Sequence, residues 1–185
     1  MSTNFAHFTW PTSFGCTILT ENLILPTGYN LTLGITPISD SHLDITTGFK
    51  KLKSLVDFGL HNSVFVSQSN ELAKSITHIN NNRVVFSNEP YDFFVGCVFF
   101  CKFMAITDKY FDIEFLTIDS HIGDNIQYTI FHPEESGLEL SGDFWWNEDS
   151  LDTGAGDRIN WHDLDIEIRP GFEPKIIRGG LSEQK

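Results

Sequence analysis

The sequence predicts a single α+β domain, residues 1–185, with a mostly antiparallel sheet, one amphipathic helix and one buried central helix. Its length is that of one domain, and its 41% hydrophobic content is enough to build a core. Short alternating apolar segments bounded by Gly, Pro and Asn are typical of strands. Two segments depart from this alternation, at about 46–58 and about 90–107, and their period or length is that of a helix.

The N-terminal part predicts three strands. Short apolar segments place the first two at 14–19 and 23–25, and alternation of apolar and polar residues places the third at 31–36. The sequence Pro-Thr-Gly at 26–28 is expected to stop the second strand, because Pro lacks an N–H and Gly favours turns.

The segment 46–58 predicts the amphipathic helix. Its apolar residues follow a three-four spacing, as expected for a helix with one face on the core; they are Phe49, Leu52, Leu55 and Val56. Asp44 or Thr46 is expected to cap its start, and Gly59 to end it in the left-handed conformation.

The segment 90–107 predicts a helix that is buried on most sides. Between Phe93 and Ile106 only Gly96 and Lys102 are neither apolar nor Cys, a run too long for an ordinary strand. Asn88 and Pro90 supply signals for a helix start. The segment is too short to span a membrane. The alternative interpretation is two strands, 93–97 and 99–103.

The remaining elements complete the α+β pattern. Strands are predicted at 63–67, 83–86, 111–118, 126–131, 161–168 and 175–178, a weak helix at 70–76, and a frayed tail at 179–185.

The distribution of charge restricts the partners of the chain. The net charge is −13, and residues 134–167 contain 11 acidic residues and one basic residue, Arg158. Direct binding to a nucleic-acid backbone is therefore excluded, since that requires clustered Lys and Arg. A basic partner or a metal cation would be attracted to this part of the chain. Three Cys without a disulfide pattern and an N-terminus without a signal peptide predict a cytoplasmic protein.

Tryptophans next to acidic residues predict a recognition surface. Trp145 and Trp146 precede Glu148 and Asp149, and Trp161 follows in the same acidic stretch. Tryptophan is enriched at the centres of protein interfaces. The alternative is that the first two indoles close the core under a loop; on an extended backbone one would point inward and the other outward.

Three carboxylates form the best candidate for chemistry. Asp163, Asp165 and Glu167 alternate along the predicted strand 161–168 and share one face, where they are able to hold a divalent cation or act in acid–base catalysis. Their spacing resembles the Glu-x-Asp-x-Glu strand of laminarinase-type glycoside hydrolases, with Asp163 where that family has glutamate. The resemblance implies a jelly-roll cleft lined by tryptophans. The alternative is a solvated acidic strand face.

These observations favour a non-enzymatic, acidic cytosolic binding protein of the inhibitor, immunity or phage accessory type. Its acidic, Trp-bearing C-terminal half would dock on a basic protein partner. The first alternative is a hydrolase that uses Asp163, Asp165 and Glu167, with or without a divalent metal. The second is a structural or assembly subunit, for example of a phage particle, which predicts a homo-oligomer.

Overall fold

The computed structural model of the chain describes residues 7–72, 83–123, 126–150 and 152–154. They form a six-stranded sheet with the order β4-β3-β1-β2-β5-β6. Its strands are β1 (Phe8–Leu19), β2 (Ile24–Pro37), β3 (Ser63–Ser67), β4 (Arg83–Phe86), β5 (Phe111–Ser120) and β6 (Gln127–Ile130). β3 runs parallel to both β1 and β4, and the other neighbours are antiparallel. The predicted α+β fold with a mostly antiparallel sheet is confirmed.

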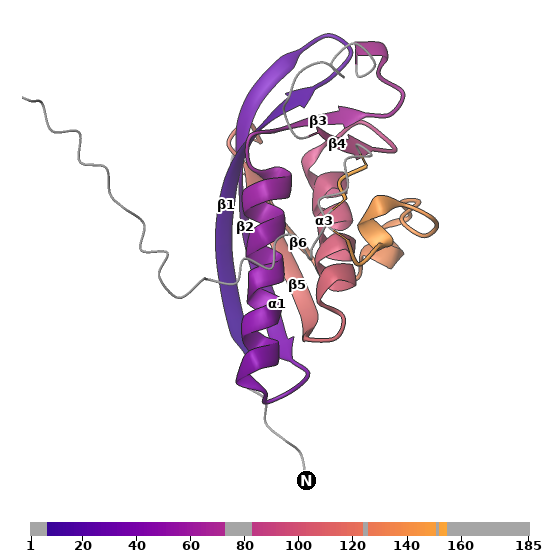
Figure 1. Cartoon of the computed structure of the whole chain (residues 1–185). Coiled ribbons are helices and arrows are strands. Elements are labelled where there is room, and N and C mark those ends of the chain that lie inside the picture. The colour runs from indigo at the N-terminus through magenta and orange to yellow at the C-terminus, as the bar shows by residue number, and fades with distance from the viewer. Residues whose placement is uncertain (1–6, 73–82, 124–125, 151, 155–185) are drawn as a thin grey trace, which may run out of the picture.

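The sheet is curved, and both long helices lie on its concave side (Figure 1). Alternate residues of β1 contact them: Phe8 packs on Phe49 of the first helix, and Trp10 packs on Phe103 of the second. The intervening residues of β1, such as Thr9 and Ser13, are exposed on the convex side. The alternation therefore sets which face of the sheet carries the core.

β2 is one continuous strand through the predicted stop at 26–28, so that prediction is wrong. Pro26 pairs with Thr17 of β1, and β2 begins to pair with β5 only at Tyr29. Pro26 therefore lies where β2 has a neighbour on one side only, and its missing N–H breaks no ladder. Gly28 leaves room for the ring of His121, whose Cε1 would be 2.7 Å from an added Cβ.

The amphipathic helix α1 (His42–Ser54) continues into a π-helical segment, Leu55–Leu60. It begins four residues before the predicted start, because Ser41 is its N-cap and accepts a hydrogen bond from the N–H of Asp44. Gly59 lies inside the π-helical segment, and the left-handed residue that follows is Asn62, with φ of 57°. The predicted caps were therefore wrong, although the buried stripe was right.

The central helix α3 (Asp92–Thr107) is buried on most of its surface, as predicted. It packs against the inner face of the sheet on one side and against the segment that follows β6 on the other, as Figure 1 shows. A helix covered from both sides needs no polar face, which explains its nearly uniform apolar sequence. Its N-cap is Tyr91, without a side-chain cap, and not the predicted Asn88.

None of the helices in the described part of the chain is long and apolar enough to cross a bilayer. The described strands and both helices contribute to one hydrophobic core. The predicted strands 161–168 and 175–178 and the tail 179–185 lie outside the described residues, and so does most of the predicted helix 70–76.

Candidate functional site

Trp145 and Trp146 are core side chains in the structure. They lie in a short 3₁₀ turn, Trp145–Asn147, where their exposed fractions are 8% and 1%. Each indole N–H donates to a backbone carbonyl: Trp145 to Val85 at 2.7 Å and Trp146 to Leu140 at 3.0 Å. Both rings face the core, as the alternative interpretation expected. One ring would point outward on an extended backbone, but a 3₁₀ turn does not alternate its side chains. A binding role for these two residues stays a prediction.

Glu148 and Asp149, which follow this turn, are exposed. Asp149 forms an ion pair with Lys51 of α1, with 2.8 Å between Nζ and Oδ1. This pair links the end of the turn to the first helix. Trp161, the third predicted binding tryptophan, lies outside the described residues.

A buried lysine holds this turn against α3. The side chain of Lys102 is fully buried, and its ammonium donates to the carbonyls of Trp145 at 2.7 Å and Glu148 at 2.9 Å. The ammonium also lies 5.4 Å from the centre of the Trp145 ring. Burial lowers the pKa of Lys102 to about 8, although Asp152, Glu148 and Asp149 oppose the shift.

The same stretch of chain closes one edge of the sheet. The N–H of Val85 in β4 donates to the Thr153 carbonyl at 2.9 Å, and the Thr153 hydroxyl donates to the Arg83 carbonyl at 2.6 Å. With the bond from Trp145 to Val85, these contacts occupy backbone groups of an edge strand that would otherwise be open to pairing.

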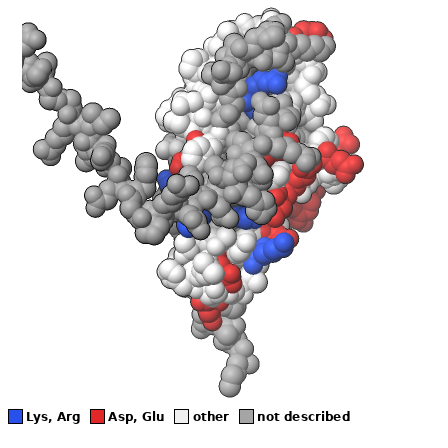
Figure 2. Space-filling view, viewed as in Figure 1, with Lys and Arg blue, Asp and Glu red and all other residues white. Residues whose placement is uncertain are grey.

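We call residues 131–154 the acidic segment, because this stretch of sequence contains seven Asp and Glu and no Lys or Arg. Six of these carboxylates belong to exposed residues: Glu134, Glu135, Glu139, Asp143, Glu148 and Asp149. Figure 2 shows acidic side chains gathered on the side of the molecule where this segment covers α3. The acidic segment is thus a layer with apolar residues facing α3 and carboxylates facing solvent.

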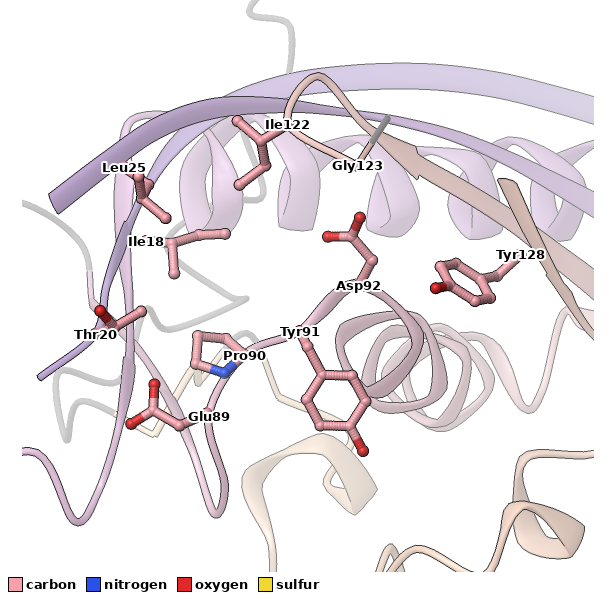
Figure 3. Close-up of a pocket in the computed structure, with 10 residues that line it drawn as sticks. All are labelled: Ile18, Thr20, Leu25, Glu89, Pro90, Tyr91, Asp92, Ile122, Gly123 and Tyr128. Carbon is pink, nitrogen blue, oxygen red and sulfur yellow. The ribbon is translucent and has the colours of Figure 1, made fainter. Parts of the chain in front are cut away.

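The second candidate site is a cavity of about 360 Å³ at the N-terminal end of α3 (Figure 3). Its walls come from the β1–β2 hairpin, the start of α3 and the β5–β6 connection. The lining residues are Ile18, Thr20, Leu25, Glu89, Pro90, Tyr91, Asp92, Ile122, Gly123 and Tyr128. We call this space the α3 cavity.

Two hydroxyl groups fix the carboxylate of Asp92 in the α3 cavity. Tyr29 donates to its Oδ1 at 3.1 Å and Ser120 donates to its Oδ2 at 2.6 Å. Burial, with the charge of Asp92 as a second cause, raises the pKa of Tyr29, so the phenol stays protonated as a donor. The nearby thiol of Cys16 has a pKa raised to about 12, first by burial and then by Asp92, and stays neutral.

Gly123 leaves the space that this arrangement requires. A Cβ on residue 123 would lie 2.6 Å from Oδ2 of Asp92 and 2.9 Å from Oγ of Ser120. The turn after β5 therefore passes close over the hydrogen bond between them. In Figure 3 the Asp92 side chain points toward Gly123, while Glu89 and Thr20 lie on the other side of the cavity.

The predicted metal ligands Asp163, Asp165 and Glu167 lie outside the described residues. Among the residues that are described, no group of three or more His, Cys, Asp or Glu is placed to hold a metal ion. A divalent cation at 163–167 stays a prediction.

The sequence offered one signal for the α3 cavity. Asp92 follows Pro90 in the sequence, so it is an acid in the first turn of the helix, where it meets the helix dipole. Its partners Tyr29 and Ser120 are 63 and 28 residues away, and no local motif connects them. A buried strand tyrosine and a serine at a strand end are too common to identify such a site.

Comparison with models of known protein families and with curated proteins found no match for this chain.

Proposed function

We propose that this protein is a non-enzymatic binding protein that docks a basic protein partner through its acidic segment. The observation that carries the proposal is that residues 131–154 contain seven acidic residues and no Lys or Arg, and that six of the seven are exposed. Such a surface attracts a cationic protein and discriminates against acidic ones, through complementary potentials that also raise the association rate.

The contacts beneath the acidic segment support a docking role. Lys102 anchors its backbone from below, and Asp149 is held by Lys51. A surface held in one conformation loses little entropy on binding, which favours affinity. In this proposal the exposed carboxylates make the contacts, and the buried indoles of Trp145 and Trp146 act as supports behind them.

The cytosol is the compartment that fits this proposal. The three cysteines, Cys16, Cys97 and Cys101, are free in the structure. Thiols stay reduced in the cytosol, whereas secreted proteins commonly pair them. An inhibitor, an immunity protein or a phage accessory protein is the kind of binding protein that these features fit best.

The test distinguishes binding through the acidic segment from unspecific binding that depends only on the net charge of the protein. The protein is titrated with a fluorescent oligolysine peptide, and binding is followed by anisotropy at low and high salt. The triple variant Glu134→Gln, Glu135→Gln, Glu139→Gln removes three exposed charges from the segment. The control, Glu21→Gln, Asp40→Asn, Asp108→Asn, removes three exposed charges elsewhere.

We expect the segment variant to bind roughly tenfold more weakly than the control, since exposed charges contribute about 0.2–1 kcal/mol each. Binding should also weaken at high salt, because exposed charges are screened. Equal losses in the two variants would show that only net charge matters and would refute the proposal. An oligoglutamate peptide of the same length should not bind.

A further inference from the structure

The α3 cavity has the composition of a site for an aliphatic cation. Most of its wall is apolar, from Ile18, Leu25, Pro90 and Ile122, with the rings of Tyr91 and Tyr128 beside them (Figure 3). A concave apolar space with a few polar groups is the usual form of a small-ligand site. Its volume of about 360 Å³ is within the range of such sites.

The charges of the cavity are all of one sign. Glu89 and Asp92 are carboxylates, and none of the lining residues given above is Lys or Arg. An anionic ligand would meet repulsion from both. The start of α3 does not offset this, because Asp92 already occupies its first turn and meets the helix dipole.

The Asp92 carboxylate is prepared to accept further hydrogen bonds. An ionised carboxylate has about four acceptor positions. The hydroxyls of Tyr29 and Ser120 use two, one on each oxygen, and hold the group in a single orientation. The remaining positions suit an ammonium group, which is a donor only. Charge-assisted bonds of this kind are the strong ones.

We propose that the α3 cavity binds an aliphatic amine, with the ammonium group at Asp92 and the alkyl chain against the apolar wall, while Glu89 on the other side of the cavity adds negative potential. The ligand class is a primary alkylammonium, whether a free amine or the side chain of a lysine. This inference goes beyond the proposed function, because the acidic segment contributes no residue to the cavity. Either proposal can fail while the other holds.

The binding test uses three ligands with the same chain: hexylamine, hexan-1-ol and hexanoate. Each is titrated into the full-length protein by isothermal calorimetry. We expect hexylamine to bind at least about tenfold more tightly than hexan-1-ol, and hexanoate not to bind, because a hydrogen bond between charged groups contributes at least this factor. Equal binding of the amine and the alcohol overturns the proposal. The proposal is also overturned if neither hexylamine nor the lysine peptide described below binds.

Variants then locate the site. Asp92→Asn and Glu89→Gln keep the shape of each side chain and remove its charge. Asp92→Asn should weaken hexylamine binding about tenfold, because the ammonium group loses its charged acceptor. Glu89→Gln should weaken binding by a smaller factor, about twofold to fivefold, because Glu89 is exposed and acts across the cavity. Gly123→Ala places a Cβ 2.6 Å from Oδ2 of Asp92 and should weaken binding without a change of charge. Asp40→Asn and Glu139→Gln are the matched controls at exposed positions outside the cavity.

The controls also distinguish the two proposals. Glu139→Gln lies in the acidic segment and should leave amine binding unchanged. The loss of oligolysine binding caused by the triple variant of the acidic segment should be the same with and without Glu89→Gln. Glu89 is exposed, so its variant should fold even where Asp92→Asn does not. Unchanged amine binding in both Glu89→Gln and Gly123→Ala overturns the assignment.

A blocked lysine peptide and its norleucine counterpart identify the source of the amine. Binding of the lysine peptide but not the norleucine peptide supports a protein side chain as the natural ligand. Binding of hexylamine without the lysine peptide supports a free amine. Both outcomes agree with the proposed chemistry, and binding of neither amine overturns it.

Discussion

Replacing Lys102 by methionine should remove a pH-dependent part of the folding free energy. Methionine keeps a long unbranched side chain in the core but has neither charge nor donor. Lys102 is fully buried, and its pKa is about 8 in the folded protein, against 10.5 for an ordinary lysine. The folded and unfolded states therefore bind different numbers of protons when the pH lies between these two pKa values.

Whether the free energy of unfolding rises or falls with pH depends on which state holds the proton. Between pH 8 and 10.5 the unfolded chain keeps Lys102 protonated while the folded protein releases the proton. The free energy of unfolding of the wild type therefore rises with pH across this window. A difference of 2.5 pKa units corresponds to about 3 kcal/mol in total. Below pH 8 both states are protonated and this contribution no longer changes.

At neutral pH two effects of the substitution oppose each other. Removing the ammonium relieves the cost of its burial, about 3 kcal/mol by the same pKa difference. It also leaves the carbonyls of Trp145 and Glu148 without this donor, at roughly 1–3 kcal/mol each. We therefore expect the variant to lie between about 1 kcal/mol more stable and about 3 kcal/mol less stable than the wild type at pH 7, and to be less stable by about a further 3 kcal/mol above pH 10.5.

Urea unfolding of both proteins at several pH values from 7 to 10.5 measures this difference. The thiols of Cys16, Cys97 and Cys101 have pKa values raised by burial to about 12, 11 and 11, so their ionisation destabilises the fold at high pH. They are present in both proteins, and their effect cancels in the difference. Lys109→Met, at an exposed position in the turn after α3, controls for net charge. A wild-type-minus-variant difference that stays constant over this range would refute the reasoning.

Two further predictions concern α3 and its surroundings. Gly96→Ala should destabilise the fold by about 1–3 kcal/mol in urea unfolding, although alanine favours helices. The added Cβ would lie 2.5 Å from Cδ1 of Ile130 and 2.8 Å from Cγ2 of Ile118, so the packing must shift. A variant more stable than the wild type would show that this interface has room for a methyl group. Labelling of the three cysteines with a thiol reagent at pH 8 should be slow in buffer and fast in urea, because burial keeps them protonated. Fast labelling of Cys16 or Cys97 in buffer would contradict their burial.

The sequence predicted the elements whose cause is local. An apolar run of helix length predicted α3, and short apolar segments predicted β3 and β4 with the observed bounds, Ser63–Ser67 and Arg83–Phe86. It failed where a neighbour far along the chain decides the outcome. β2 continues through Pro26 because β5 starts to pair only at Tyr29, and the register of two strands determines that position.

The candidate sites were harder to predict for the same reason. The acidic residues of 131–154 are visible in the sequence, but the inward orientation of both Trp145 and Trp146 depends on carbonyls of Leu140 and of β4. Lys102 stands out in the sequence as the one charged residue between Phe93 and Ile106. Its two acceptors lie 43 and 46 residues later in a loop, and no local pattern predicts such a pairing.

Lys102 also explains how the acidic segment stays on the molecule. A layer with six exposed carboxylates repels itself, and this repulsion opposes the gain from burying Trp145 and Trp146. A cation placed beneath it, bonded to two of its carbonyls and near Asp149 and Asp152, offsets that repulsion from the inside. The free energy that is spent on burying the Lys102 ammonium is thus returned in part as stabilisation of the acidic segment. The acidic segment and the central helix should therefore loosen together when Lys102 is lost.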